Sequence, residues 1–145
     1  MRTVQMKSAM CWIIGFGGAL VTALWGGWTE GLMTLVILMG IDYCCGLIVA
    51  GVFHKSKKSD NGALSSIAGW KGIMRKFVTL LIVSVAYRID VVVNTNYLRD
   101  AVTIAFSVNE CISIIENAGL MGIPIPQKLR DAIEVLKEKQ GLKSK

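Results

Sequence analysis

Charged residues are scarce in this chain, and their near absence from its first third excludes the largest class of proteins. They make up 18% of the 145 positions, against roughly 25% in a typical soluble domain. Residues 8–53 contain only two of them, Glu30 and Asp42. A soluble protein of this size lacks the interior to bury so long an apolar stretch. The sequence therefore indicates a membrane protein.

Residue patterns that bind metals or carry out catalysis are also missing. The four cysteines, Cys11, Cys44, Cys45 and Cys111, lie inside apolar stretches without a C-x-x-C pair, and His54 is the single histidine. That set does not suit a structural zinc site. The sequence has no nucleotide-binding loop and no serine with a clear histidine partner. We therefore expect no metal, no cofactor and no enzymatic activity.

Four apolar stretches are long enough to cross a bilayer as helices. They cover about residues 8–28, 31–53, 77–97 and 101–121. Each has about 20 residues, which as a helix match the roughly 30 Å hydrocarbon core. Glycines between Trp25 and Trp28 indicate a tight turn after the first stretch. We expect an all-α integral membrane protein with four spans, in which residues 1–145 form a single membrane domain.

Basic residues gather outside these stretches, and their distribution predicts the orientation of the chain. The loop 54–76 and the segment after residue 121 hold six Lys or Arg each, and the N-terminal tail holds two. Since such residues favour the cytoplasmic face, four spans place both termini in the cytoplasm. The second half of the loop predicts a short amphipathic helix in the membrane interface, and residues 126–140 predict an amphipathic cytosolic helix.

Small residues recur at every fourth position of the first stretch. The candidates for helix packing are Gly15, Ala19, Ala23 and Gly27, with Gly46 in the second stretch. Helices in lipid pack closely where small side chains let their backbones approach. We predict that this row is a packing face, and the sequence leaves open whether it packs within one chain or between chains.

Polar side chains within the apolar stretches are the candidate functional residues. They are Asp42, Arg88, Asp90, Asn109, Glu110, Ser113, Glu116 and Asn117. A charge at the centre of a membrane helix costs on the order of 2.5–3.5 kcal/mol, so these groups should pair or face water. The polar face of the fourth stretch fits either a seam inside a bundle or the wall of a pore. Similar depths predict that Arg88 pairs with Asp42 or Glu110, within one chain or across a subunit boundary.

Several short motifs carry a resemblance to a known family. They are Gly40–Gly46, Ser65–Lys76, Arg88–Asp90, Asn109–Glu110, Ile114–Gly119 and Gly122–Leu129. Through them, roughly residues 30–140 resemble the phage-lysis and toxin-secretion holins of Gram-positive bacteria and their phages. The resemblance implies a non-enzymatic protein that forms homo-oligomers in the cytoplasmic membrane and permeabilises it. A peptidoglycan hydrolase (an endolysin) or a toxin would then leave the cytoplasm.

Other partners and functions follow less well from the sequence. The basic residues lie between apolar stretches, so we expect the lipid bilayer and no nucleic acid as their partner. A small four-span transporter has a similar size, but such transporters carry an essential glutamate in their first span, which here has no charge. A regulatory protein of the antiholin type also stays open.

Overall fold

The computed structural model describes residues 2–56 and 65–139, which form five helices and the connections between them. The helices are α1 (Arg2–Trp25), α2 (Glu30–Gly51), α3 (Ser66–Val93), α4 (Leu98–Leu120) and α5 (Gln127–Lys139). The all-α fold class is thus confirmed, with no strand among the described residues. Two helices, α1 and α2, are long and apolar enough to cross a membrane. The tail helix expected at 126–140 is present, with residue 140 outside the described residues.

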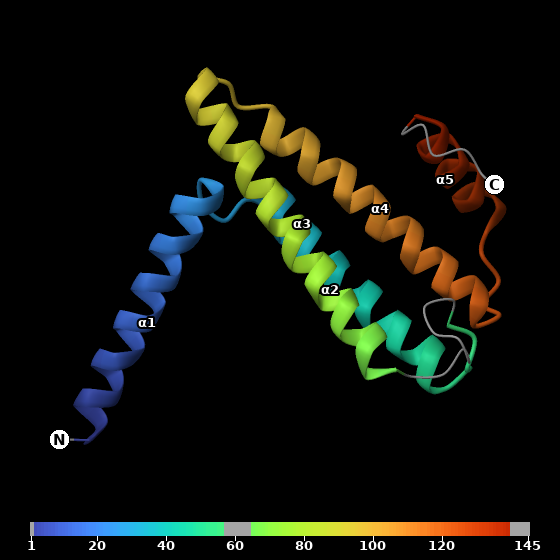
Figure 1. Cartoon of the computed structure of the whole chain (residues 1–145), viewed down its shortest axis with the longest axis horizontal. Helices are drawn as coiled ribbons and strands as arrows, with labels where there is room; N and C mark the ends of the chain where they lie inside the picture. Colours follow the sequence, from blue (N-terminus) through green and yellow to red (C-terminus); the bar gives the residue numbers. More distant parts are fainter. Residues whose placement is uncertain (1, 57–64, 140–145) are drawn as a thin grey trace.

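Helices α2, α3 and α4 pack into a bundle, in which α2 contacts mainly α4 (Figure 1). The buried core comprises Leu32, Leu35 and Met39 of α2 with Val83 of α3. The three α2 residues are three and four positions apart, so they lie on one face of that helix. Their burial sets the face that α2 turns toward its neighbours.

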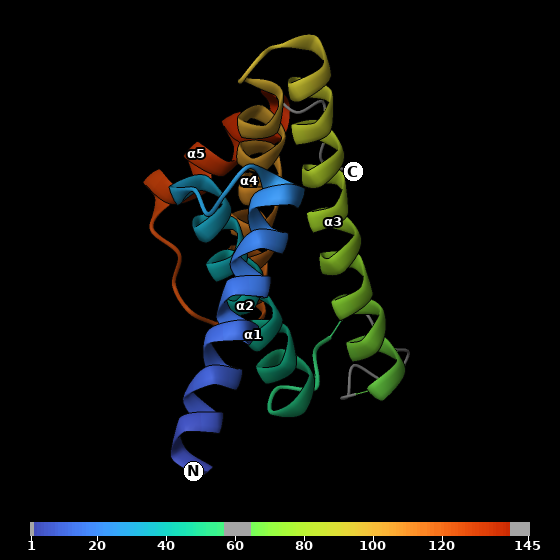
Figure 2. The same ribbon diagram turned by 90° about the vertical axis from the view of Figure 1, so that its left-hand side faces the viewer.

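Helix α1 joins this bundle only through its C-terminal end. The indole Nε1 of Trp25 donates a hydrogen bond to the Leu80 carbonyl (3.0 Å), and Ser84 Oγ donates to the Leu24 carbonyl (2.8 Å). From this attachment α1 extends away, and its N-terminal end lies apart from the other helices in both views (Figures 1 and 2). Its described side chains are exposed over residues 5–20. The first span is therefore unpacked within the chain over most of its length.

The turn after α1 depends on a glycine. Gly26 has φ +76°, a left-handed conformation that residues with a Cβ atom rarely adopt. A Cβ atom at Gly26 would also lie 2.4 Å from the Tyr87 ring. Arg99 supports the same turn, since its Nη1 donates to the Trp25 carbonyl at 3.1 Å. The end of α1 is thus fixed against both α3 and the start of α4.

The expected interfacial helix is not separate from the helix of the expected third span. Helix α3 is one continuous helix of 28 residues, rather than an interfacial helix within a loop 54–76 followed by a span over 77–97. Ser65 caps its start by accepting a hydrogen bond from the Ala68 amide at 3.4 Å, which satisfies a backbone donor that the helix leaves free. Residues 57–64 of the expected loop lie outside the described residues. The early start brings Lys76 into the helix, with consequences for the polar centre of the bundle.

The turn between α3 and α4 is organised by Asp90, which is only 3% exposed. Its carboxylate accepts hydrogen bonds from the amides of Leu98 (3.1 Å) and Arg99 (2.8 Å) at the start of α4. The hydroxyl of Thr95 donates to it as well, at 2.5 Å. A carboxylate in this place satisfies free amides and interacts favourably with the helix dipole. Asp90 is thus a helix cap rather than an isolated charge.

Candidate functional site

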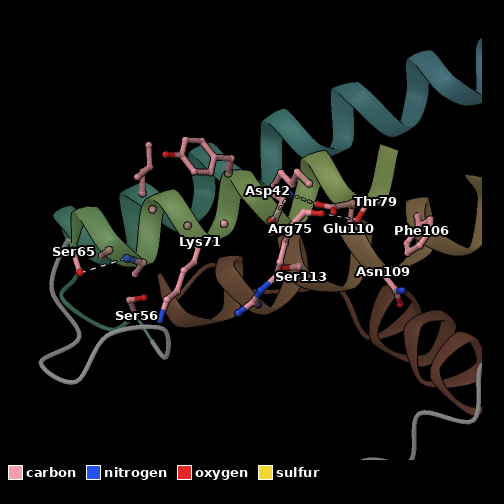
Figure 3. A pocket seen from close by; sticks show the side chains of 18 residues that line it. Asp42, Ser56, Ser65, Lys71, Arg75, Thr79, Phe106, Asn109, Glu110 and Ser113 are labelled. Carbon is pink, nitrogen blue, oxygen red and sulfur yellow. Dashed lines mark hydrogen bonds and ion pairs between the residues drawn. The ribbon is translucent and has the colours of Figure 1, made fainter. Parts of the chain in front are cut away.

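The centre of the bundle holds one ammonium group between two carboxylates. Lys76 of α3 places its Nζ 2.8 Å from Asp42 Oδ2 of α2 and 2.5 Å from Glu110 Oε2 of α4. Figure 3 draws Asp42 and Glu110 on the same side of the cavity that they line. We call these three residues the charge cluster. It joins the three helices of the bundle through their side chains.

The helix lengths explain why these residues meet. Lys76 lies ten residues after the start of α3, Asp42 nine before the end of α2, and Glu110 ten before the end of α4. At 1.5 Å per residue, each lies roughly 14–15 Å from the end of the molecule where α2 ends, α3 begins and α4 ends. All three side chains therefore reach one level in the middle of the bundle.

A fourth polar side chain completes the cluster's surroundings. The Asn117 amide Nδ2 donates to Asp42 Oδ1 at 3.3 Å, and both residues are buried. Asp42 thus accepts from Lys76 and from Asn117 with different oxygens. Buried charges are stable when such partners replace water. The arrangement holds α2, α3 and α4 in one register, which is a structural role.

The predicted pairing of Arg88 within the chain is wrong. Lys76 contacts both Asp42 and Glu110, whereas Arg88 is exposed on α3. Arg88 follows Lys76 by twelve residues, about 18 Å along the helix, and so lies far from the cluster's level. The early start of α3 is the reason, because it places a different cation at the depth of the carboxylates. Pairing of Arg88 across a subunit boundary stays a prediction.

The other polar candidates of α4 divide between the interior and the surface. Asn117 is buried and Ser113 is half-buried, while Asn109 and Glu116 are exposed. Thr103, on the same helix, is also buried, and its hydroxyl donates to the Arg99 carbonyl at 2.7 Å. Part of the polar face of α4 therefore lies inside the bundle as a seam, and the rest of that face is exposed.

The row of small residues is not used for packing within the chain. A Cβ atom added at Gly15, Gly27 or Gly46 would have no atom within 4 Å. Ala19 and Ala23 are exposed. Packing between chains remains the prediction for the residues of this row in α1.

A cavity of about 510 Å³ lies beside the charge cluster, between α2, α3 and α4. Its size falls within the usual range for small-molecule sites. Asp42, Lys76 and Glu110 line one part of it, and Lys71 and Arg75 line another. In Figure 3 the side chains of Lys71 and Arg75 extend from α3 across this space. Ser113 and Glu116 line a second, smaller cavity of about 80 Å³.

Sequence reasoning missed Lys76 because hydropathy placed it at the end of a loop. Two signals were present. Ser65 precedes the segment as a helix N-cap, and a helix from that point puts Lys76 at the level of Asp42 and Glu110. Arg99 was also missed, because its contact with Trp25 joins residues 74 positions apart.

The chain is similar in sequence to proteins of bacteria and phages. Residues 19–138 match the bacteriophage holin family. An uncharacterized protein of Halalkalibacterium halodurans is 38% identical over 138 residues, covering 91% of this chain and 96% of the relative. An uncharacterized protein of Listeria monocytogenes is 37% identical over 130 residues, covering 89% and 86%. A protein of Bacillus phage phi105 named as a probable holin is 31% identical over 111 residues, covering 76% of each chain. No solved structure matches the chain significantly.

Proposed function

The chain belongs to the bacteriophage holin family, and from this premise we propose that it assembles in the cytoplasmic membrane and permeabilises it. The opening would release a peptidoglycan hydrolase or a toxin from the cytoplasm. The observation that carries the proposal, beyond the family, is α1, an apolar helix whose small-residue row meets nothing in its own chain. In lipid such a row is a surface on which helices associate.

Family membership confirms two expectations from the sequence. The resemblance to holins is confirmed by the match over residues 19–138 and by the phage relative. The family permeabilises membranes without enzymatic chemistry, so the protein is not an enzyme. The topology of the protein and its assembly are parts of our proposal.

For the topology we propose four spans, α1 to α4, with both termini in the cytoplasm. The α1–α2 and α3–α4 turns lie near one end of the molecule, and Arg99 links them through the Trp25 carbonyl (Figure 1). The ends of α2 and α4 and the start of α3 lie at the opposite end of the bundle, while α1 carries the N-terminus away from the bundle (Figure 1). Lys71, Arg75 and Lys76, near the start of α3, support a cytoplasmic placement of that second end. Reporter fusions after residues 30, 60, 98 and 145 would then read outside, inside, outside and inside.

For the assembly we propose that α1 pairs with α1 of other copies while the bundle of α2, α3 and α4 keeps its own shape. The charge cluster favours this division, because separating the three helices would expose paired charges to lipid. Helix α1 has no such constraint, since residues 8–28 carry no charge. Homo-oligomers joined through α1 would then surround an opening.

The function is tested by induced expression in bacteria, with and without a cytosolic peptidoglycan hydrolase. Membrane potential and turbidity are followed together in each culture. We expect an abrupt loss of potential in both cultures and lysis only where the hydrolase is present. Accumulation of the chain in the membrane with the potential intact would contradict the proposal. Efflux driven by a proton gradient would instead identify a transporter.

A matched pair of variants links this phenotype to α1. Ala19→Leu alters the small-residue row, whereas Gly17→Leu places the same side chain on α1 outside that row. A Cβ atom at Gly17 meets nothing within 4 Å, so the control is sterically free. We expect Ala19→Leu to delay the loss of potential and Gly17→Leu to leave its timing close to that of the parent. Equal timing in both variants would remove α1 packing from the mechanism.

A further inference from the structure

The cavity between α2, α3 and α4 is lined on one side by cations that the charge cluster does not use. Lys71 and Arg75 are four residues apart, so they share one face of α3. Among the described residues, the cations that form ion pairs are Lys76 and Arg99, and neither Lys71 nor Arg75 forms one. Both side chains extend into the cavity (Figure 3). Lys71 and Arg75 therefore present two positive charges to a ligand in the cavity.

The carboxylates in the same cavity cancel these charges only in part. Asp42 and Glu110 both contact Lys76, and Asp42 also accepts from Asn117. These three charged groups carry one net negative charge, against the two positive charges of Lys71 and Arg75. Lys71 precedes Lys76 by five residues, about 7.5 Å nearer to the start of α3. The cavity therefore has a deep part that holds the charge cluster and an outer part near the α2–α3 connection that is positive.

Hydroxyl and apolar groups line the remaining walls. Ser56, Ser65 and Ser113 contribute hydroxyls. Leu47 and Ala50 of α2 provide apolar surface in the same cavity. A ligand that fits both kinds of wall has an anionic, hydroxyl-rich part and an apolar part.

We propose that this cavity binds the phosphate headgroup of an anionic phospholipid, with Lys71 and Arg75 contacting the phosphate. Arginine can donate two parallel hydrogen bonds to phosphate oxygens, and lysine adds a compact charge. The serines would donate to the headgroup's remaining oxygens, and the acyl chains would follow Leu47 and Ala50. Basic pockets between membrane helices on the cytoplasmic side are suited to such lipids.

The position of the cavity along the membrane supports a lipid over a soluble anion. It lies where α2 ends and α3 begins, which is the cytoplasmic end under the topology proposed above. Trp70, which is 62% exposed, directly precedes Lys71 on α3. Tryptophan favours the headgroup level of a bilayer. A lipid at this site would hold α2, α3 and α4 together at the membrane surface.

The test measures lipid retention by native mass spectrometry of the full chain in detergent, titrated with phosphatidylglycerol or phosphatidylcholine. We expect the parent to retain phosphatidylglycerol preferentially. The variant Lys71→Gln/Arg75→Gln should retain it roughly 30-fold less tightly, since each basic residue near a charged headgroup contributes about fivefold. The control Lys7→Gln/Arg88→Gln removes the same two charges from exposed positions outside the cavity and should retain lipid as the parent does.

A second variant tests the cavity without changing its charge. Ser113→Phe places a ring in the space while Lys71 and Arg75 stay in place, and it should also reduce retention. Circular dichroism of each variant establishes that helix content is kept. Equal retention of the two lipids by the parent, or an equal loss in the control, would overturn the proposal. Displacement of the lipid by millimolar inorganic phosphate would overturn the lipid assignment in favour of a soluble anion.

These outcomes are independent of the proposed holin function. If the chain depolarises cells but shows no preference for phosphatidylglycerol, the lipid site is refuted and the holin function is supported. If the chain binds the lipid and never depolarises cells, the lipid site is supported and the holin function is refuted.

Discussion

Helices α1 and α2 have similar lengths and both are apolar enough to cross a membrane, yet the structure uses them differently. Helix α2 buries Leu32, Leu35 and Met39 against its neighbours and contributes Asp42 to the charge cluster. Helix α1 touches the bundle through its last turn and is exposed elsewhere. Hydropathy alone therefore does not tell which span belongs to the bundle.

The different packing of α1 and α2 comes from their polar residues rather than from their apolar ones. The carboxylate of Asp42, in the middle of α2, requires a partner, and the partners from α3 and α4 fix three helices at one level. Helix α1 lacks any charge between residues 8 and 28 and offers small residues instead. Such residues permit association without specifying a partner inside the chain. The bundle is thus a fixed unit, and α1 is the part available to other copies.

The largest expected effect is from removal of the central cation. Lys76→Met leaves Asp42 and Glu110 together without their ammonium group, which should destabilise the bundle by on the order of 3–5 kcal/mol. Thermal unfolding in detergent and the level of membrane-inserted protein measure it. Adding Asp42→Asn and Glu110→Gln to Lys76→Met should recover most of the loss. A triple variant no more stable than Lys76→Met would show that the cluster does not hold the helices.

A smaller effect is expected at the α3–α4 turn. Asp90→Ala removes the acceptor for the first amides of α4 and should cost about 1–2 kcal/mol, as loss of a helix cap does. Asp100→Ala is the matched control, because Asp100 lies in the first turn of α4 but its side chain is 58% exposed. Chemical unfolding of both variants in detergent gives the comparison. Equal losses would mean that general charge near the helix start, rather than the cap, stabilises α4.

The attachment of α1 is tested at the two glycines of its turn. Gly26→Ala and Gly27→Ala both place an alanine at positive φ, but only the first brings a Cβ atom against the Tyr87 ring. Gly26→Ala should therefore increase hydrogen exchange at the end of α1 more than Gly27→Ala does. The double variant Gly26→Ala/Tyr87→Ala should approach the level of Gly27→Ala. Indistinguishable exchange in the two single variants would argue against the ring contact.

The smallest expected effect is at Arg88. Arg88→Met changes an exposed residue and should alter the unfolding free energy of the monomer by less than about 0.5 kcal/mol. The same variant in assembled membranes tests whether Arg88 pairs across a subunit boundary. A loss of stability in the monomer as large as that of Lys76→Met would restore the original prediction that Arg88 pairs within the chain.

Much of the fold was predictable because it rests on local patterns. Stretches with almost no charge predict α1 and α2, and apolar positions three and four residues apart after Pro126 predict the tail helix. Helix α3 was misjudged because Lys71, Arg75 and Lys76 lower the hydropathy of its first turns, although a capping serine precedes them. The site was predictable only in part. Asp42 and Glu110 were identified as needing a cation, but its identity depends on where α3 begins, which hydropathy does not determine.

The central claim, that α1 associates between copies through its small-residue row, is tested most directly by disulfide crosslinking at Cys11. This cysteine belongs to the row by its four-residue spacing from Gly15, and it is exposed in the structure. With Cys44, Cys45 and Cys111 changed to alanine, oxidant added to membranes should link Cys11 residues of two copies into a covalent dimer, because a disulfide needs Cα atoms within about 7 Å. Moving the single cysteine to position 13, on the opposite face of α1, should abolish that dimer. Dimers that form equally from both positions, or from neither, would contradict the account.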